Sequence, residues 1–373
     1  MKSFINCLLC TRNITFIMLL AARIINNPSN GLSISRCLLS SKRCTITSLN
    51  SIAQKEKLMG VLGNGNEPIS TKSKTVKLYQ NISAKAKTRN EMKLTLIEGH
   101  RLVIDTLSQD SSRSLYHDVL VSYEALNHPQ LGEKLSEKLC ELLETNKECR
   151  VRLAEQNVIN AACDTVTPQG VVALIRIPKP YEYTSKTTGS ETKLRSKFYL
   201  ILDAISDPGN AGTLIRSAKA TGIEAIVLLP NCCDVFNPKA VRSAMGSTFH
   251  VPICSFSSWD DCYSMMSTFC VSGKDIFAAT MDGSEKYSSD GNLQFNSIPH
   301  YDIDWHDPTS GGKALIIGKE GSGLSDPVRD AFSRGDIRTI HVPMEPGIES
   351  LNAAVCGSVI MFEYHRQAKS NRY

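Results

Sequence analysis

A predicted strand runs into the turn sequence Asp207-Pro208-Gly209-Asn210, whose residue types and spacing could do chemistry. These turn formers end the strand and predict that a helix begins with Asn210 as its N-cap. The free N–H groups at a helix start favour an anion, and Arg216, about one and a half turns further on, can hold a phosphate in a planar fork. The plainer alternative is an ordinary strand-turn-helix unit with a surface arginine.

A second candidate is the glycine-rich loop Gly318–Gly323, which follows the apolar strand Ala314–Ile317. A buried strand followed by glycines lets the backbone approach a nucleotide-like ligand closely. The glycines are in the order GxxGxG, which differs from the GxGxxG of dinucleotide-binding folds. No acidic residue ends a neighbouring strand at the usual ribose-binding distance. The pattern therefore disfavours a nicotinamide or flavin enzyme.

A third loop, Val342–Leu351, joins a strand to the last predicted helix. That helix opens with residues small enough to pack very closely against another element: Ala353, Ala354, Gly357 and Ser358. A plain C-terminal helix capped by Ser350 would explain the helix but would leave the loop unexplained.

In this order and near this spacing, the three segments resemble the three motifs of the SpoU family of knotted RNA methyltransferases. The likeness runs from Phe198 to the C-terminus and includes Asn237–Ser247, which is similar to the family's NPK-x-x-R-x-(S/A)-x-G segment. Upstream, Ile97–Arg101 and Pro168–Val171 resemble the opening and closing signatures of the family's N-terminal RNA-binding domain.

The resemblance implies an α/β protein with two domains. A small α/β ribosomal-protein-like RNA-binding domain would precede a C-terminal parallel-sheet domain tied in a trefoil knot, which is an exception to the rule that protein chains are unknotted. The family also dimerises through the knot region, so a homodimer is expected.

The resemblance also assigns site residues and a cofactor, S-adenosylmethionine, held between the second and third loops. The implied cofactor-binding residues are Gly318, Val342, Met344, Ser350 and Leu351. The implied catalytic residues are Asn210, Arg216, Glu320 and Asn352. Lys319 stands where the family's second motif usually has asparagine.

The implied reaction is 2'-O-methylation of a ribose in RNA, with mitochondrial large-subunit rRNA as the expected substrate. A ribose hydroxyl is a poor nucleophile, so it must be aligned with the sulfonium methyl group and lose its proton. A pKa above about 12 argues against arginine as an unaided base. We therefore expect Arg216 to clamp a phosphate, while that phosphate or a water accepts the proton. The sulfonium is already activated, so no metal is needed.

Three alternatives stay open. The substrate could be tRNA, or the chain could be a catalytically silent RNA-binding factor in ribosome assembly. The intact set of candidate catalytic residues argues against the silent factor. A base methyltransferase is the third alternative, and the Asn-x-Gly-x-x-x-Arg and Ser-Leu-Asn segments argue against it.

The elements that must position these residues follow from the hydrophobic pattern. From Phe198 onward strands alternate with helices, which predicts a parallel sheet. The expected strands are 198–205, 223–229, 250–254, 275–280, 313–317 and 338–342. The expected helices are 211–221, 238–245, 259–269, 326–332 and 350–365. The polar stretch 281–312 is expected to be a surface insertion in this domain, 198–373.

Upstream, the first ordered domain is expected at 76–178, after a flexible lead-in at 56–75 and before a polar linker at 179–197. Its predicted strands are 94–97, 118–121 and 170–177, and its predicted helix is 131–143. Eight basic residues lie between Thr71 and Arg101 against only Glu91 and Glu98. They are either a solvated helix face or a track for RNA phosphates. The RNA-binding candidates are Lys85, Lys87, Arg89 and Arg101.

The overall composition is that of a globular protein, with its excess positive charge at one end. Residues 1–55 hold seven of the 42 Lys and Arg residues and no acidic residue, which is typical of a mitochondrial transit peptide. A disordered tail, or a secretory signal at 14–22, are the alternatives. The remaining 35 basic residues face 37 acidic ones, so RNA contacts require a local patch.

Thirteen irregularly spaced cysteines favour a reducing compartment, such as the mitochondrial matrix, over a zinc site. No apolar run is long enough to span a membrane.

Overall fold

The computed structural model describes residues 55, 58–62, 69–179, 197–268, 271–280, 286–287, 293–294, 297–307, 311–348 and 350–370. Almost all of the expected leader and linker therefore lies outside the described residues.

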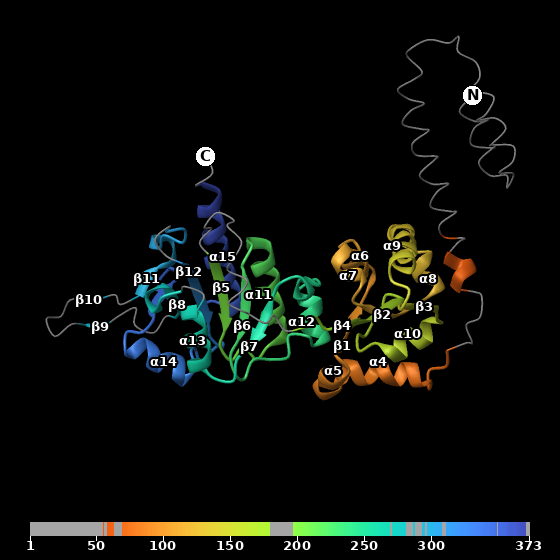
Figure 1. The fold of residues 1–373 in the computed structure, drawn as a ribbon, viewed down its shortest axis with the longest axis horizontal. Coiled ribbons are helices and arrows are strands. Elements are labelled where there is room, and N and C mark those ends of the chain that lie inside the picture. The colour runs from red at the N-terminus through yellow and green to blue at the C-terminus, as the bar shows by residue number, and fades with distance from the viewer. Residues whose placement is uncertain are drawn as a thin grey trace, which may run out of the picture. The chain divides into compact units, whose positions relative to one another are not determined.

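Within this part of the chain, the C-terminal domain contains one parallel sheet in the order β11-β13-β8-β12-β5-β6-β7 (Figure 1). Every pairing in it is parallel, which confirms the predicted sheet. Its strands are β5 (Lys197–Leu202), β6 (Ala225–Leu228), β7 (Ile253–Ser255), β8 (Ile276–Ala279), β11 (Ser297–Pro299), β12 (Gly312–Ile317) and β13 (Arg338–His341).

Helices cover both faces of this sheet because its strands are apolar on both sides. Leu200 on one face of β5 packs with residues of α11 (Pro208–Thr221) and α15 (Ala353–Ser370). Ile201 on the other face packs with residues of α13 (Trp259–Thr268) and α14 (Asp326–Ser333). The short helix α12 (Pro238–Ser243) packs against α11. Short 3-10 turns are η2 (Ser247–Phe249), η3 (Gly273–Asp275) and η4 (His300–Asp302).

The stretch 281–312 is more than the surface insertion that its polarity predicts. Its first part contains the two-stranded pair β9 (Lys286–Tyr287) and β10 (Leu293–Gln294). Its second part supplies β11, which pairs with β13 at the edge of the main sheet. Trp305 is fully buried and packs against Phe198 and Phe277. The prediction was wrong here because a few apolar side chains, Trp305 and Ile303 among them, can anchor a segment that is mostly polar.

The upstream domain has a mixed sheet in the order β1-β4-β2-β3. Its strands are β1 (Leu94–Glu98), β2 (Tyr116–Val121), β3 (Arg150–Leu153) and β4 (Val171–Arg176), and β4 is antiparallel to both of its neighbours. Its helices are α4 (Lys74–Ala84), α5 (Ala86–Met92), α6 (His100–Leu107), α7 (Asp110–Arg113), α8 (Tyr123–Leu126), α9 (Gly132–Thr145) and α10 (Gln156–Ala162). Residues of α6 and α9 pack on one face, and residues of α4 and α10 on the other.

Two leucines of the expected flexible lead-in belong to this domain's core. Leu58 and Leu62, in the helical segment 58–62, are almost fully buried beside residues of α6 and α9. The lead-in prediction was therefore wrong for this segment, because two apolar side chains at i and i+4 are enough to seat one helical turn on an apolar surface.

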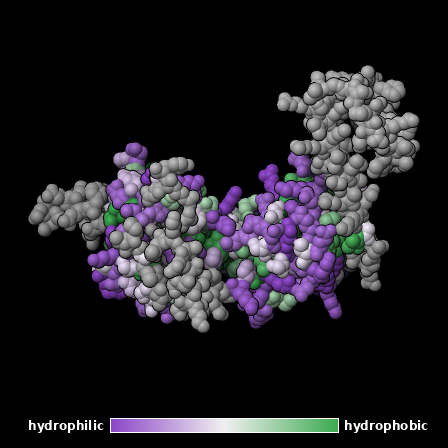
Figure 2. Space-filling view, turned by 45° about the horizontal axis from the view of Figure 1, so that its top comes forward, coloured by the Kyte–Doolittle hydropathy of each residue, from purple (hydrophilic) through white to green (hydrophobic). Residues whose placement is uncertain are grey.

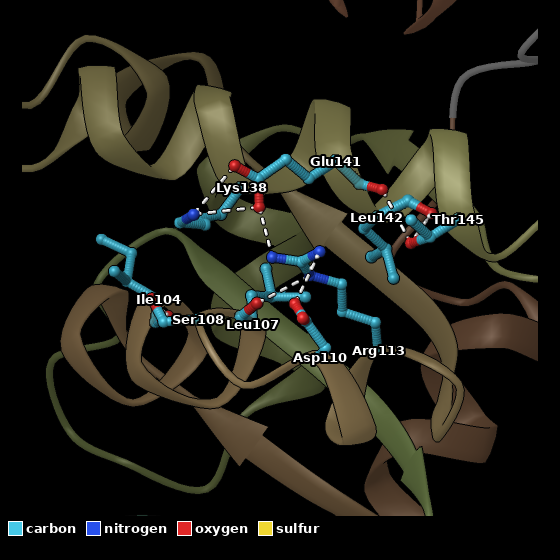
Figure 3. Close-up of polar contacts among 9 residues, drawn as sticks. All are labelled: Ile104, Leu107, Ser108, Asp110, Arg113, Lys138, Glu141, Leu142 and Thr145. Atoms are coloured by element: carbon cyan, nitrogen blue, oxygen red, sulfur yellow. Dashed lines mark hydrogen bonds and ion pairs between the residues drawn. The ribbon is translucent and has the colours of Figure 1, made fainter.

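A polar cluster ties α6, α7 and α9 together (Figure 3). The Arg113 guanidinium donates to the Leu107 carbonyl at 2.9 Å and pairs with Glu141. Lys138 also donates to the Glu141 carboxylate, at 2.8 and 2.9 Å. These two cations are paired with a carboxylate of the same domain, so we do not count them with the candidate RNA-binding residues.

The surface in Figure 2 is mostly hydrophilic, with small and separate apolar patches among the coloured residues. Among the helices that the structure describes, none is both long enough and apolar enough to cross a membrane.

Candidate active site

Helix α11 places the first set of candidate residues. Its N-cap is Asp207, whose Oδ1 accepts a hydrogen bond from the Asn210 N–H at 2.9 Å, and Pro208 follows at the first helical position. Asn210 therefore lies in the first turn, and the prediction that it is the N-cap was wrong. An Asp-Pro pair before a helix is the sequence signal that identifies the true cap. Because Asp207 takes the cap position, the Asn210 amide is left to bind other groups.

The side chains of Asn210, Glu320 and Asn352 meet in one hydrogen-bonded set, which we call the catalytic edge. The Asn352 amide donates to Asn210 Oδ1 at 3.1 Å and to Glu320 Oε1 at 2.8 Å. Asn210 Nδ2 donates to the same Glu320 oxygen. Three predicted catalytic residues, from segments far apart in the sequence, thus hold one another in place.

Asn352 has a second task at the start of α15. Its Oδ1 accepts the backbone N–H groups of Ala354 at 2.9 Å and Val355 at 3.2 Å. Asn352 therefore caps the last helix, where a plain reading of the sequence would put Ser350. One side chain fixes both the helix start and the catalytic edge.

The glycine-rich loop is closed on itself by its backbone. Lys319 and Gly323 exchange two backbone hydrogen bonds, at 2.9 and 2.8 Å. Gly321 and Gly323 have φ of 78° and 70°, and a Cβ on Gly318 would lie 2.6 Å from the Gly323 carbonyl oxygen. The glycines are therefore required by backbone geometry, and the tight loop presents Glu320.

Asp203, at the end of β5, anchors the far end of this loop. Its Oδ2 accepts the N–H of Ser325, the N-cap of α14, at 2.7 Å. Its own N–H donates to the carbonyl of Ile317, at the end of β12, at 2.9 Å. Burial raises the pKa of this carboxyl, although the hydrogen bonds from Ser325 act in the opposite direction. Sequence reasoning missed this residue, because an aspartate at the end of a strand is an ordinary pattern.

A cleft of about 1070 Å³ opens between the second and third loops. All five predicted cofactor-binding residues line it: Gly318, Val342, Met344, Ser350 and Leu351. Apolar side chains such as Leu324 and Phe332 complete the wall, and Glu320 and Asn352 stand on its lining. Apolar walls suit a flat base, while one carboxylate, Glu320, and two cations, Lys319 and Arg329, suit a polar group that carries charges of both signs. The cleft therefore fits S-adenosylmethionine.

Arg216 does not belong to the hydrogen-bonded set of the catalytic edge. It is exposed on α11, and no partner for its side chain occurs among the residues that the structure describes. The neighbouring face of α11 packs on α15, where Ser217 and Ser358 share a hydrogen bond of 2.8 Å. A Cβ on Gly357 would lie 2.5 Å from Leu214, so the close packing predicted for the small residues of the last helix is confirmed.

The four RNA-binding candidates differ in burial. Lys85, Lys87 and Arg101 are exposed. Arg89 is only 2% exposed, and its guanidinium donates to the carbonyls of Ile82 and Ser83, both at 2.8 Å, and to Asp234 at 2.7 Å. Its assignment to RNA is therefore corrected to a structural role. On the short helix α5, sequence spacing alone did not show which basic residue turns inward.

Two family models match the chain. The SpoU rRNA Methylase family matches residues 197–362, and the RNA 2'-O ribose methyltransferase substrate-binding family matches residues 96–181. The chain belongs to the SpoU family of RNA methyltransferases. The resemblance seen in the sequence is thereby confirmed, and S-adenosylmethionine is the cofactor of this enzyme family.

Individual relatives agree with this membership. The chain is 31% identical over 296 residues to zebrafish (Danio rerio) "rRNA methyltransferase 3A, mitochondrial", covering 73% of this chain and 63% of the relative. It is 28% identical over 293 residues to Bacillus subtilis "23S rRNA (guanosine(2553)-2'-O)-methyltransferase", covering 79% and 96%. An AdoMet-bound rRNA methyltransferase structure from Sinorhizobium meliloti aligns with a TM-score of 0.59 at 25% identity, covering 81% and 97%.

Proposed function

We propose that this protein transfers the methyl group of S-adenosylmethionine to a ribose 2'-hydroxyl in mitochondrial large-subunit rRNA. The observation that carries the proposal is the catalytic edge, where Asn210, Glu320 and Asn352 are joined by hydrogen bonds beside the cofactor cleft. The names of the zebrafish and Bacillus relatives support rRNA and the ribose 2'-oxygen as the target.

In this proposal the bound cofactor supplies an activated methyl group, and the protein side chains position the acceptor. The Asn210 and Asn352 amides hold the Glu320 carboxylate at a fixed place, where it can orient the ribose hydroxyl. Arg216, free on the outer face of α11, clamps the phosphate of the target nucleotide. That phosphate or a water then accepts the hydroxyl proton.

We further propose a homodimer formed through α15 and the trefoil knot implied by family membership. Val355, Val359 and Phe362 follow one another at i, i+4 and i+7, and they are 49%, 37% and 51% exposed. An apolar stripe on the exposed face of a helix favours a protein partner. Because Arg216 lies on the neighbouring helix, such an interface would border the phosphate clamp.

The proposed location is the mitochondrial matrix. Curated relatives from zebrafish, mouse and human carry the word mitochondrial in their names. The acid-free, basic residues 1–55 support the same location as an import signal.

The deciding experiment is methyl transfer in vitro from isotope-labelled S-adenosylmethionine, followed by digestion of the RNA to nucleosides and mass spectrometry. Large-subunit rRNA should yield a labelled 2'-O-methyl nucleoside in buffer containing EDTA. Label on a base would show a base methyltransferase, and label on tRNA alone would change the substrate class. Tight RNA binding without any label would show a silent assembly factor, and the proposed activity would then be abandoned.

A further inference from the structure

The Asn237–Ser247 segment has no part in the catalytic edge or in the cofactor cleft, yet the structure holds it firmly against α11. Its helix α12 buries Pro238, Ala240 and Val241. A Cβ on Gly212 of α11 would lie 2.3 Å from the Ala240 carbonyl oxygen. Such close backbone contact fixes α12 relative to the helix that carries Asn210 and Arg216.

Two cations project from the outer side of this fixed helix. Lys239 and Arg242 are at i and i+3, so they are neighbours on the helix surface, with Cβ atoms roughly 5–6 Å apart. Their side chains are 57% and 43% exposed. A lysine provides a mobile point charge and an arginine provides a planar fork, and both bind phosphate.

Both cations have a carboxylate partner in the protein, and both side chains remain partly exposed. Lys239 Nζ lies 2.9 Å from Asp207 Oδ2, an ion pair open to solvent that contributes little stability. Arg242 Nη1 lies 3.9 Å from Glu98 Oε2, which is too far for a hydrogen bond. Within the described residues the Arg242 guanidinium makes no hydrogen bond, so its donors are available.

The partners also show where the two cations lie. Asp207, beside Lys239, caps α11 and accepts the Asn210 N–H, so Lys239 is next to the catalytic edge. Glu98, beside Arg242, lies in the Ile97–Arg101 signature of the substrate-binding domain. The pair therefore lies between the two parts of the protein that an RNA substrate has to touch.

We infer that Lys239 and Arg242 form a phosphate-binding pair that guides the RNA strand from the substrate-binding domain to the catalytic edge. The inference rests on the proposed function and adds the path of the RNA backbone. It assigns the lysine and the arginine of the NPK-x-x-R segment a direct contact with the substrate. In the RNA complex, a phosphate replaces Asp207 as the partner of Lys239.

The test compares K239Q, R242Q and the double variant with R334Q, a matched control. Arg334 is also an exposed arginine paired with one carboxylate, Asp336. It lies just before β13, at the amino ends of the parallel strands, whereas the catalytic edge lies at their carboxyl ends. Filter binding to in vitro transcribed large-subunit rRNA is measured across a salt series. Each of the two single changes should reduce the magnitude of the slope of log K for RNA binding against log salt by roughly 0.7–0.9. The double change should reduce it by about twice that, and R334Q should leave it unchanged. The affinity of the double variant at ~0.1 M salt should fall roughly tenfold or more.

If Lys239 acted only by positioning Asp207, a different result would be expected. The D207N variant distinguishes this positioning role from direct phosphate binding by Lys239. Asparagine is as good an N-cap as aspartate, so α11 keeps its start while the ion pair is lost. If Lys239 binds phosphate, D207N should keep the full salt slope and bind RNA at least as tightly as the wild type. The inference is overturned if D207N weakens RNA binding as K239Q does, or if the double variant keeps the wild-type slope. Absence of methyl transfer by the wild type would instead reject the proposed function.

Discussion

The catalytic edge and helix α5 both present polar side chains to solvent, but they hold them differently. At the edge, the side chains of Glu320 and Asn352 are exposed and yet bonded to each other and to Asn210. On α5, Lys87 has only a 3.9 Å contact with Glu91, and the single inward cation, Arg89, is buried. Exposed residues that are tied together can fix the geometry of a reaction, whereas exposed residues that are loose can contribute charge alone.

This difference predicts that changes at the two regions affect different measurements. Variants around the catalytic edge should alter the rate of methyl transfer at saturating RNA. Variants of the loose lysines should alter RNA affinity and its dependence on salt, because phosphate contacts are electrostatic. The following variants test whether that division holds.

The largest expected effect is at Arg216, which lies on the same helix as Asn210 without belonging to the hydrogen-bonded set of the catalytic edge. Arg216→Ala should lower single-turnover methylation by about a hundredfold or more, because an oriented charge contact in the transition state is lost. Arg216→Lys should restore little, since an ammonium cannot replace the planar fork. Folding and cofactor affinity should be unchanged. Lys219→Ala, one turn further along α11, is the control and should stay within about twofold of the wild-type rate. Near-normal methylation by Arg216→Ala would remove the arginine from the mechanism.

The second largest expected effect distinguishes the buried arginine of α5, Arg89, from the exposed lysines near the start of that helix. Arg89→Ala should reduce the free energy of unfolding by about 2–3 kcal/mol, because the carbonyls of Ile82 and Ser83 and the carboxylate of Asp234 lose their donor. The double change Lys85→Gln, Lys87→Gln should alter that free energy by less than about 0.5 kcal/mol. It should nevertheless weaken RNA binding and flatten its salt dependence. Urea melts and filter binding measure the two effects. A stable Arg89→Ala variant with weak RNA binding would reverse the correction made for Arg89.

The smallest effect concerns Asp203, which anchors the glycine-rich loop. Burial raises the pKa of this carboxyl in the folded protein, so its ionisation opposes folding as the pH rises through that value. Asp203→Asn keeps an oxygen for the Ser325 N–H and removes the charge. Thermal melts should therefore show the Asn variant melting above the wild type at neutral pH, with the difference shrinking as the pH falls. Asp203→Ala should melt below both and bind the cofactor more weakly. If the Asn variant melts below the wild type at every pH, the ionised carboxylate is itself required.

The sequence alone was sufficient for the class of fold and for most of the candidate site. Apolar runs alternating with amphipathic stretches predicted the parallel sheet, because that pattern depends only on which residues each local element must bury. Glycines at 318, 321 and 323 marked the loop, because backbone torsions limit which residues it accepts. The motif residues of the cleft were named from the resemblance to the SpoU family, which was visible because each motif is a short continuous segment.

Only the tertiary structure decided which of those residues act together. The ends of β5 and β12 and the start of α15 lie at one edge of the domain, which is why Asn210, Glu320 and Asn352 meet. The order of these residues in the sequence does not show how close their side chains are in space. The inward turn of Arg89 and the burial of Trp305 likewise depend on surfaces supplied by distant segments. Local pattern limits what each segment can form, whereas long-range packing selects which side chain finds a partner and which is left free for the substrate.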